Sequence, residues 1–253
     1  MRRPFFLLAA IASSFVLSFV AIAQDRPPEN PGPNSNITRW AAGKLTFREV
    51  ESQRVTGEEF FRLSVHPDGT RTMMAWYNSF LYNNHRHVVM RVEESFRPIE
   101  VFINAWVGDF GYKGSTRAIV DGNQLKTTAW GPEGAAEQVV QVPDTFSIIT
   151  HAEVLNTWST WGGDLDVDIE RERFAIDLAG RRQEAPFLGT IFRGKVAFVG
   201  EERLTVPAGT FDTLHYRSGD LEMWATKQDR ILVQQRYPPL GIEYVLTQFE
   251  SGQ

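Results

Sequence analysis

The chain has 253 residues, of which 42% are hydrophobic, with a formal net charge of −5 and no cysteine. This charge balance excludes the basic surface that a nucleic-acid-binding domain needs. The lack of cysteine excludes disulfides, thiolate metal sites and a cysteine nucleophile. The length suits one β-rich domain or two small ones.

The first 23 residues have the pattern of a secretory signal peptide. Arg2 and Arg3 precede an apolar run, which ends in Ala-Ile-Ala at residues 21–23. An uncleaved membrane anchor is the alternative, because the run is nearly long enough to span a bilayer. Cleavage leaves 24 basic and 31 acidic side chains, a formal charge of −7. The pattern predicts a periplasmic or secreted protein that meets a membrane only through its cleavable signal peptide.

Residues 24–39 are predicted to form a disordered linker, because they contain four prolines and almost no apolar side chain. The domain is predicted to occupy residues 40–253. From Lys44 onward apolar and polar side chains alternate, and turn residues interrupt the alternation at short intervals, which is typical of antiparallel strands. Hairpin turns are predicted at residues 66–69 and 121–123.

One segment breaks the alternation. Between residues 142 and 161, Ile148, Ala152 and Leu155 recur at helical spacing, which predicts one helix of roughly 12 to 15 residues. Residues 162–186 are ambiguous. The expected fold class is mainly β: a single antiparallel up-and-down barrel or half-barrel with one packed helix, because a flat sheet of this many strands would leave its edges exposed.

Three C-terminal runs carry a resemblance to a known family: VGEERLTVPAGTFDTLHY (199–216), LEMWATKQDRILVQQ (221–235) and GIEYVLTQFE (241–250). They resemble a poorly characterised family of exported bacterial β-proteins, a domain of unknown function with a Val-Pro-Ala-Gly-x-Phe element. That family is similar to the open barrels of the lipoprotein-carrier and lipocalin-like type. The resemblance implies a fold and an exported location, and brings no catalytic residue with it.

A short loop at residues 218–219 joins two alternating runs. If these two residues form the hairpin loop, His215 lies opposite Glu222. Such a pair is either a cross-strand contact that fixes the register or an acid–base pair in a cavity. The following turns extend the pair into a polar row on the predicted interior face, with Trp224 in the adjoining row: His215, Glu222, Gln235 and Tyr244. Trp224 and Gln235 are predicted to bind a ligand.

A second hairpin is predicted with Val92 opposite Ile99. The same register places Val88 opposite Ile103 and makes one face uniformly aliphatic, which supports it. The opposite face then carries aromatic and polar side chains that, with the nearby Tyr82, are predicted to bind a ligand: His85, His87, Phe102, Asn104 and Trp106.

Metal and cofactor motifs are weak or missing. His85 and His87 stand two residues apart, as in some metal sites, but the sequence dictates no third ligand, so no metal is predicted. Besides a polar patch in a pocket, a surface or structural pair is the alternative for these two histidines. The alternating Asp164, Asp166 and Asp168 lack the spacing of a calcium loop and are predicted to be a solvated acidic strand or loop. Motifs for serine hydrolases, zinc proteases, phosphate loops and dinucleotide binding do not occur, and no cofactor is predicted.

Two functions from different classes remain open. The first is a binding or carrier protein that holds an apolar or aromatic small molecule, or an acyl chain, inside the barrel. The alternative is a cofactor-free small-molecule enzyme, an isomerase, dehydratase or lyase, that uses His215, Glu222 and Tyr244 as acid and base. Polar side chains inside the cavity would favour the enzyme, and polar side chains confined to its rim would favour the carrier. A scaffold for envelope proteins is a third possibility, and the sequence does not decide the oligomeric state.

Overall fold

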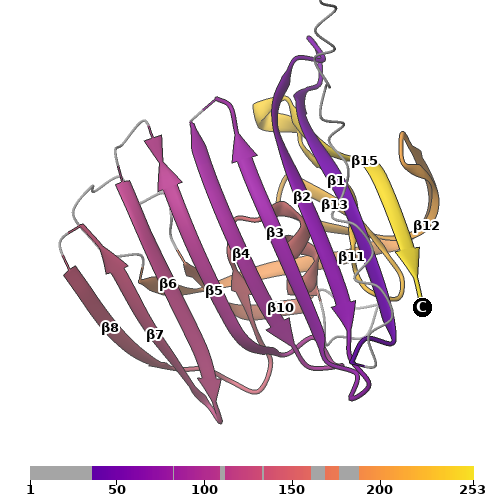
Figure 1. The fold of residues 1–253 in the computed structure, drawn as a ribbon. Helices are drawn as coiled ribbons and strands as arrows, with labels where there is room; N and C mark the ends of the chain where they lie inside the picture. Colours follow the sequence, from indigo (N-terminus) through magenta and orange to yellow (C-terminus); the bar gives the residue numbers. More distant parts are fainter. Residues whose placement is uncertain (1–35, 82, 109–111, 133, 161–168, 177–187) are drawn as a thin grey trace, which may run out of the picture.

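The computed structural model describes residues 36–81, 83–108, 112–132, 134–160, 169–176 and 188–253. In these residues the chain forms one 15-stranded sheet with short helical segments (Figure 1). The predicted signal peptide, most of the predicted linker and the acidic stretch at 164–168 lie outside the described residues. Among the described helices, none combines the length and apolar character needed to span a membrane.

The elements of the described chain are, in order: β1 (Arg39–Glu49), β2 (Val55–Val65), β3 (Arg71–Ser79), β4 (Asn84–Val92), β5 (Pro98–Val107), β6 (Tyr112–Asp121), β7 (Gln124–Gly131), β8 (Gly134–Gln141), β9 (Phe146–Ile149), α1 (Glu153–Asn156), η2 (Thr157–Thr160), β10 (Ile169–Ile176), β11 (Gly189–Val206), β12 (Gly209–Ser218), β13 (Leu221–Thr226), β14 (Leu232–Tyr237), η3 (Pro238–Leu240) and β15 (Ile242–Gly252).

The sheet consists of two meanders that meet in its middle. Strands β1 to β8 follow one another on one side, β15 back to β9 follow one another on the other, and β1 pairs with β15. The ladders are antiparallel except between β9 and β10. In the described chain β8 and β9 are the two edges, so the sheet is not closed. The predicted fold class, mainly β and a half-barrel with one packed helix, is confirmed.

The hydrophobic core lies on the inner face of the curved sheet. Figure 1 shows α1, β10 and β11 behind the face formed by β2 to β5. Alternate side chains of the front strands point into this space, and Phe61, Met73, Met90 and Ile103 are buried there. Trp158 of η2 fills the same core, so the short helical segments serve as its plug.

The predicted helix of 12 to 15 residues is wrong in its first half. Residues 146–149 form strand β9, in which Ile148 pairs with Phe174 of β10. His151 then has a positive φ of 57°, which no α-helix contains. Helical backbone begins only at Glu153, and α1 and η2 span four residues each. The β-branched run Ile148 to Thr150 suits a buried strand better than a helix.

Strand β1 includes the last residue of the predicted linker. The backbone N–H of Thr38 donates to the carbonyl oxygen of Val65, and β1 starts at Arg39. Arg39 donates two hydrogen bonds, of 3.0 and 2.6 Å, to the carboxylate of Asp229. These contacts place the last residues of the predicted linker against the sheet.

The predicted β4–β5 register is confirmed over most of its length. Val88 pairs with Ile103, and both are buried. The register shifts at the loop end, where Val92 pairs with Pro98 instead of Ile99. A bulge at this end leaves the rest of the ladder unchanged.

Candidate functional site

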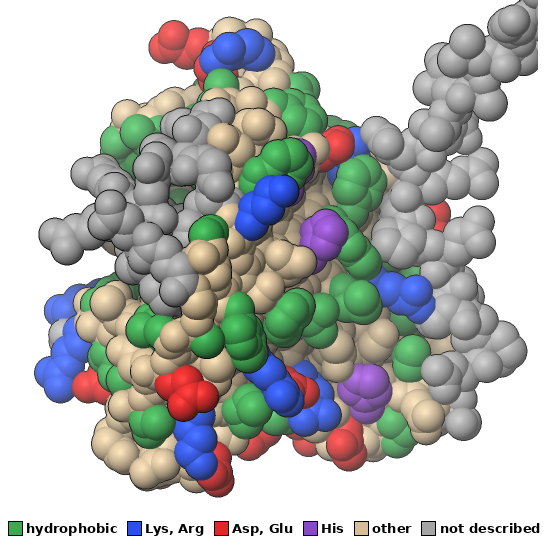
Figure 2. Space-filling model, turned by 60° about the vertical axis from the view of Figure 1, so that its left-hand side comes forward, with side chains coloured by type: hydrophobic (Ala, Val, Ile, Leu, Met, Phe, Trp, Pro, Cys, Tyr) green, Lys and Arg blue, Asp and Glu red, His purple; other side chains and the backbone are tan. Residues whose placement is uncertain are grey.

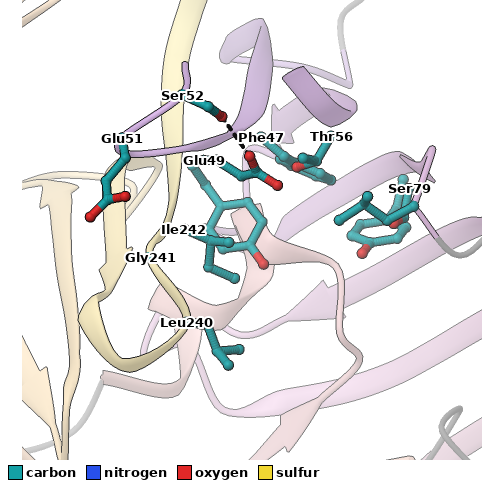
Figure 3. A pocket seen from close by; sticks show the side chains of 12 residues that line it. Phe47, Glu49, Glu51, Ser52, Thr56, Ser79, Leu240, Gly241 and Ile242 are labelled. Carbon is teal, nitrogen blue, oxygen red and sulfur yellow. Dashed lines mark hydrogen bonds between the residues drawn. The ribbon is translucent and has the colours of Figure 1, made fainter. Parts of the chain in front are cut away.

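A pocket of about 390 Å³ opens where β1, β2, β3 and β15 end together (Figure 3). Figure 3 shows the side chains of Phe47, Ser79 and Ile242, from three different strands, around one space. The volume is in the range of small-molecule sites. The lining is apolar and aromatic in its walls with polar groups among them: Phe47, Glu49, Glu51, Ser52, Thr56, Tyr77, Ser79, Leu81, Leu240, Gly241, Ile242 and Tyr244.

Three aromatic rings form one wall of the pocket. The ring centroid of Phe47 lies 5.1 Å from that of Tyr77 and 4.7 Å from that of Tyr244, the second contact being edge-on. Gly57 of β2 makes room for this wall, because a Cβ at that position would lie 2.5 Å from the Phe47 ring. The wall therefore depends on a glycine in the strand beside it.

Two buried carboxyl groups, Glu59 and Glu153, interact electrostatically with the two tyrosines of this wall. Glu59 is fully buried, because it shares the inward-facing row of β2 with Phe61. Its two oxygens accept hydrogen bonds from the backbone N–H groups of Glu153 and Val154, at 2.8 and 2.9 Å. Glu153 in turn accepts a hydrogen bond from the Gln235 side chain at 2.7 Å. Neither carboxyl group is among the residues that line the pocket.

Arg86 is the positive group of this buried cluster. Its guanidinium donates to the carbonyl oxygen of His151 at 2.8 Å and lies over the Tyr77 ring, 4.8 Å from the centroid. Burial lowers the pKa of Arg86, while Tyr77, Glu153 and Glu59 act in the opposite direction. One guanidinium thus faces two carboxyl groups inside the fold.

Burial dominates the pKa values of the cluster. Desolvation, with a further contribution from Glu153, raises the pKa of Glu59 to about 8. Desolvation also raises the pKa of Glu153 to about 7. The pKa of Tyr77 is raised to about 12 and that of Tyr244 is raised as well, first by burial and then by the charge of Glu153. Both tyrosines therefore keep their protons at neutral pH.

These carboxyl groups make stability depend on pH. A carboxyl group whose pKa is raised in the folded state makes its full contribution to the stability of the folded protein below its unfolded-state pKa. This contribution is lost as the pH rises through the folded-state pKa. For Glu59 and Glu153 this window runs from about 4.5 to about 8. We expect the free energy of unfolding to fall by at least about 2 kcal/mol between about pH 5 and about pH 8, measured by urea unfolding.

The variant Glu153→Gln tests the origin of this fall. It removes one titrating group and the charge that raises the pKa of Glu59. The fall in unfolding free energy should then shrink by about half or more. An undiminished fall in the variant contradicts the assignment of the pH dependence to this pair.

His215 and Glu222 meet, but as diagonal neighbours. The hairpin loop is Gly219 and Asp220, not residues 218–219, so His215 pairs with Trp224. Gly219 has a positive φ of 60°, which suits the loop position it occupies. The nitrogen Nε2 of His215 lies 3.6 Å from a Glu222 oxygen.

Glu202 also contacts His215, a contact that the sequence prediction missed. The nitrogen Nδ1 of His215 lies 3.0 Å from a Glu202 oxygen, and its ring stacks on Trp224 at 4.3 Å. The Trp224 indole N–H donates to the same carboxylate. The turn at Val206 to Gly209 contained the signal, because counting outward from it brings Glu202 diagonally beside His215.

The predicted polar row of four residues is wrong. A bulge at Val233 shifts the β13–β14 ladder by one residue, so that Trp224 pairs with Gln234 instead of Val233. Gln235 still pairs with Tyr244, as predicted. Both now lie on the inner face, whereas His215 and Trp224 lie on the opposite face.

The predicted ligand-binding residues of β4 and β5 lie on the outer face of the sheet. His85 pairs with Trp106 and stacks on it at 5.5 Å, and His87 pairs with Asn104. Phe102 is 41% exposed and Trp106 is 45% exposed. Figure 2 shows a face on which histidine and hydrophobic side chains lie together. These residues form an open patch and do not line the pocket, and Tyr82 lies outside the described residues.

Within the described part of the chain, no group of three or more histidine, aspartate or glutamate side chains is placed to hold a metal ion.

Comparison with known proteins finds similarity to solved structures. No family model matches the chain, and no curated protein matches it. A β-barrel-like protein of the domain of unknown function DUF1849 from Brucella abortus has a TM-score of 0.48 at 7% identity, covering 86% of this chain and 98% of that one. A DUF1089 family protein from Pseudomonas aeruginosa has a TM-score of 0.40 at 9% identity, covering 72% and 90%. The resemblance to the Val-Pro-Ala-Gly-x-Phe family stays a prediction.

Proposed function

We propose that this protein is an exported binding or carrier protein that holds a small apolar or aromatic molecule in the pocket between β1, β3 and β15. The observation that carries the proposal is the open pocket walled by Phe47, Tyr77 and Tyr244. Apolar walls with few polar groups suit reversible binding of such a molecule. Export follows from the N-terminal sequence pattern.

An acid–base enzyme is less well supported. Its proposed residues do not converge, because Tyr244 lies on the inner face and His215 on the opposite one. Glu59 and Glu153 have pKa values near neutrality, but neither lines the pocket. Of the residues that line the pocket, Tyr77 and Tyr244 keep their protons at neutral pH, and Glu49 is held by Arg54 and Ser52.

Filling the pocket tests the proposal. The variant Ile242→Trp places a larger side chain in the pocket wall. We expect it to weaken binding of the neutral apolar dye N-phenylnaphthylamine, measured by fluorescence titration, at least about tenfold. The matched control is Val199→Trp, because Val199 is 50% exposed on β11 and does not line the pocket.

Equal dye binding by the wild type and Ile242→Trp, with both proteins folded, would count against the pocket as the binding site. Native mass spectrometry of the protein purified from its own host would show whether a small molecule copurifies. A bound mass that is present in the wild type and absent from Ile242→Trp identifies the natural ligand.

A further inference from the structure

The pocket lining carries negative charge. Among the residues that line it are Glu49 and Glu51, and none is a lysine, arginine or histidine. We propose that the pocket takes an amphipathic organic cation, an amine or quaternary ammonium on an apolar or aromatic body, in preference to a carboxylate of the same shape. The proposal rests on the binding function proposed above and specifies the charge of the ligand.

The mouth of the pocket keeps a net negative charge after its ion pair is counted. Glu49 accepts a hydrogen bond from Ser52 (Figure 3). It also pairs with Arg54, whose side chain is 60% exposed. Glu51 has no ion-pair partner among the described residues and lines the same mouth. An ammonium group arriving at the mouth is attracted to Glu51, whereas a carboxylate is repelled.

The aromatic wall suits a cation as well as an apolar body. Ring faces carry partial negative charge, and sets of aromatic rings bind quaternary ammonium groups in other proteins. The ring centroid of Phe47 lies 5.1 Å from that of Tyr77 and 4.7 Å from that of Tyr244. The fold already uses this attraction, because the Arg86 guanidinium lies over the Tyr77 ring.

Three probes with one apolar body separate charge from shape. Phenylbutylamine, phenylbutanol and phenylbutanoate differ only in the polar end, and at about pH 7 the amine is cationic and the acid is anionic. Isothermal titration calorimetry on the wild-type protein is expected to show the amine binding at least about tenfold more tightly than the carboxylate, with the alcohol between them. High salt should narrow this difference.

A charge variant at the mouth tests the contribution of Glu51. We expect Glu51→Gln to weaken binding of the amine about threefold and to leave binding of the alcohol unchanged. Glu137→Gln is the matched control, because Glu137 is an exposed residue of β8 that does not line the pocket. An unchanged amine affinity in Glu51→Gln would show that the charge of Glu51 does not attract the ligand, and would overturn the proposed cation preference.

The outcomes also distinguish this inference from the proposed function. Carboxylate binding as tight as amine binding overturns the cation preference, and its loss in Ile242→Trp would still identify the pocket as the site. Binding of none of the three probes overturns the preference too. The dye titration with Ile242→Trp then decides separately whether the pocket binds apolar molecules.

Discussion

Replacing Arg86 with glutamine is expected to lower the free energy of unfolding by about 3–5 kcal/mol at about pH 8. The variant leaves Glu59 and Glu153 buried without an opposite charge. It also removes the hydrogen bond to the carbonyl oxygen of His151. At about pH 5 both carboxyl groups are able to bind protons, so the loss should be smaller by more than about 1 kcal/mol. Urea unfolding at the two pH values measures the difference.

Arg91→Gln is the matched control for this variant. Arg91 lies on the outer face of the same strand, its side chain is 46% exposed, and its contact with Glu100 is 3.4 Å long. The loss should stay below about 1 kcal/mol at both pH values, since exposed ion pairs contribute little. An equal loss of unfolding free energy in Arg86→Gln at both pH values would show that Arg86 does not compensate the charges of Glu59 and Glu153.

Replacing Trp158 with alanine is expected to lower the free energy of unfolding by about 3–5 kcal/mol. The side chain is 1% exposed and packs edge-on against Phe96 at 5.9 Å. Its indole N–H donates to the backbone oxygen of Asp229, the residue whose carboxylate holds Arg39. The variant therefore opens a cavity and loosens the loop that anchors β1. Chemical denaturation followed by circular dichroism measures the loss.

Trp106→Ala is the control of equal size change. Trp106 is 45% exposed on the outer face, and its removal should cost less than about 1 kcal/mol. The intermediate variant Trp158→Phe keeps part of the packing but not the hydrogen bond to Asp229, and should lie between the two. Similar losses at Trp158 and Trp106 would show that η2 is not part of the cooperative core.

The sequence predicted the β4–β5 register because two patterns agreed there. Alternation placed Val88 and Ile103 on one face, and the opposite face then collected aromatic and polar residues. The alternation does not indicate which of the two faces of the hairpin points toward the pocket. That choice depends on the curvature of the whole sheet, which no single hairpin determines.

The error on β14 has a local physical cause. Ile231, Leu232 and Val233 are consecutive apolar residues, followed by Gln234 and Gln235, and all five are buried. Such a run carries no period-two signal, so the bulge at Val233 left no trace in the pattern. A one-residue change there moved Gln235 and Tyr244 to the face opposite His215.

The buried cluster left a sequence signal that was not used. Glu59 stands two residues before Phe61, and Arg86 two residues before Val88, so each charged side chain interrupts a row of core residues. A charge in such a row is unusual unless it is paired. The sequence did not reveal the pairing of Glu59 with the start of α1. Glu153 lies 94 residues after Glu59 in the chain and was placed inside a longer predicted helix.

The pairing of β1 with β15 has a consequence for how the protein folds. Thr46 and Thr247 form a hydrogen bond across this seam, although 201 residues separate them in the chain. Closing so long a loop is entropically costly, and folds that depend on such contacts reach the native state slowly. Phe47 of β1 and Tyr244 of β15 wall the same pocket, so the pocket exists only once the seam is closed. If the protein is exported unfolded and binds a ligand as we propose, it would bind that ligand only after β15 had crossed the membrane.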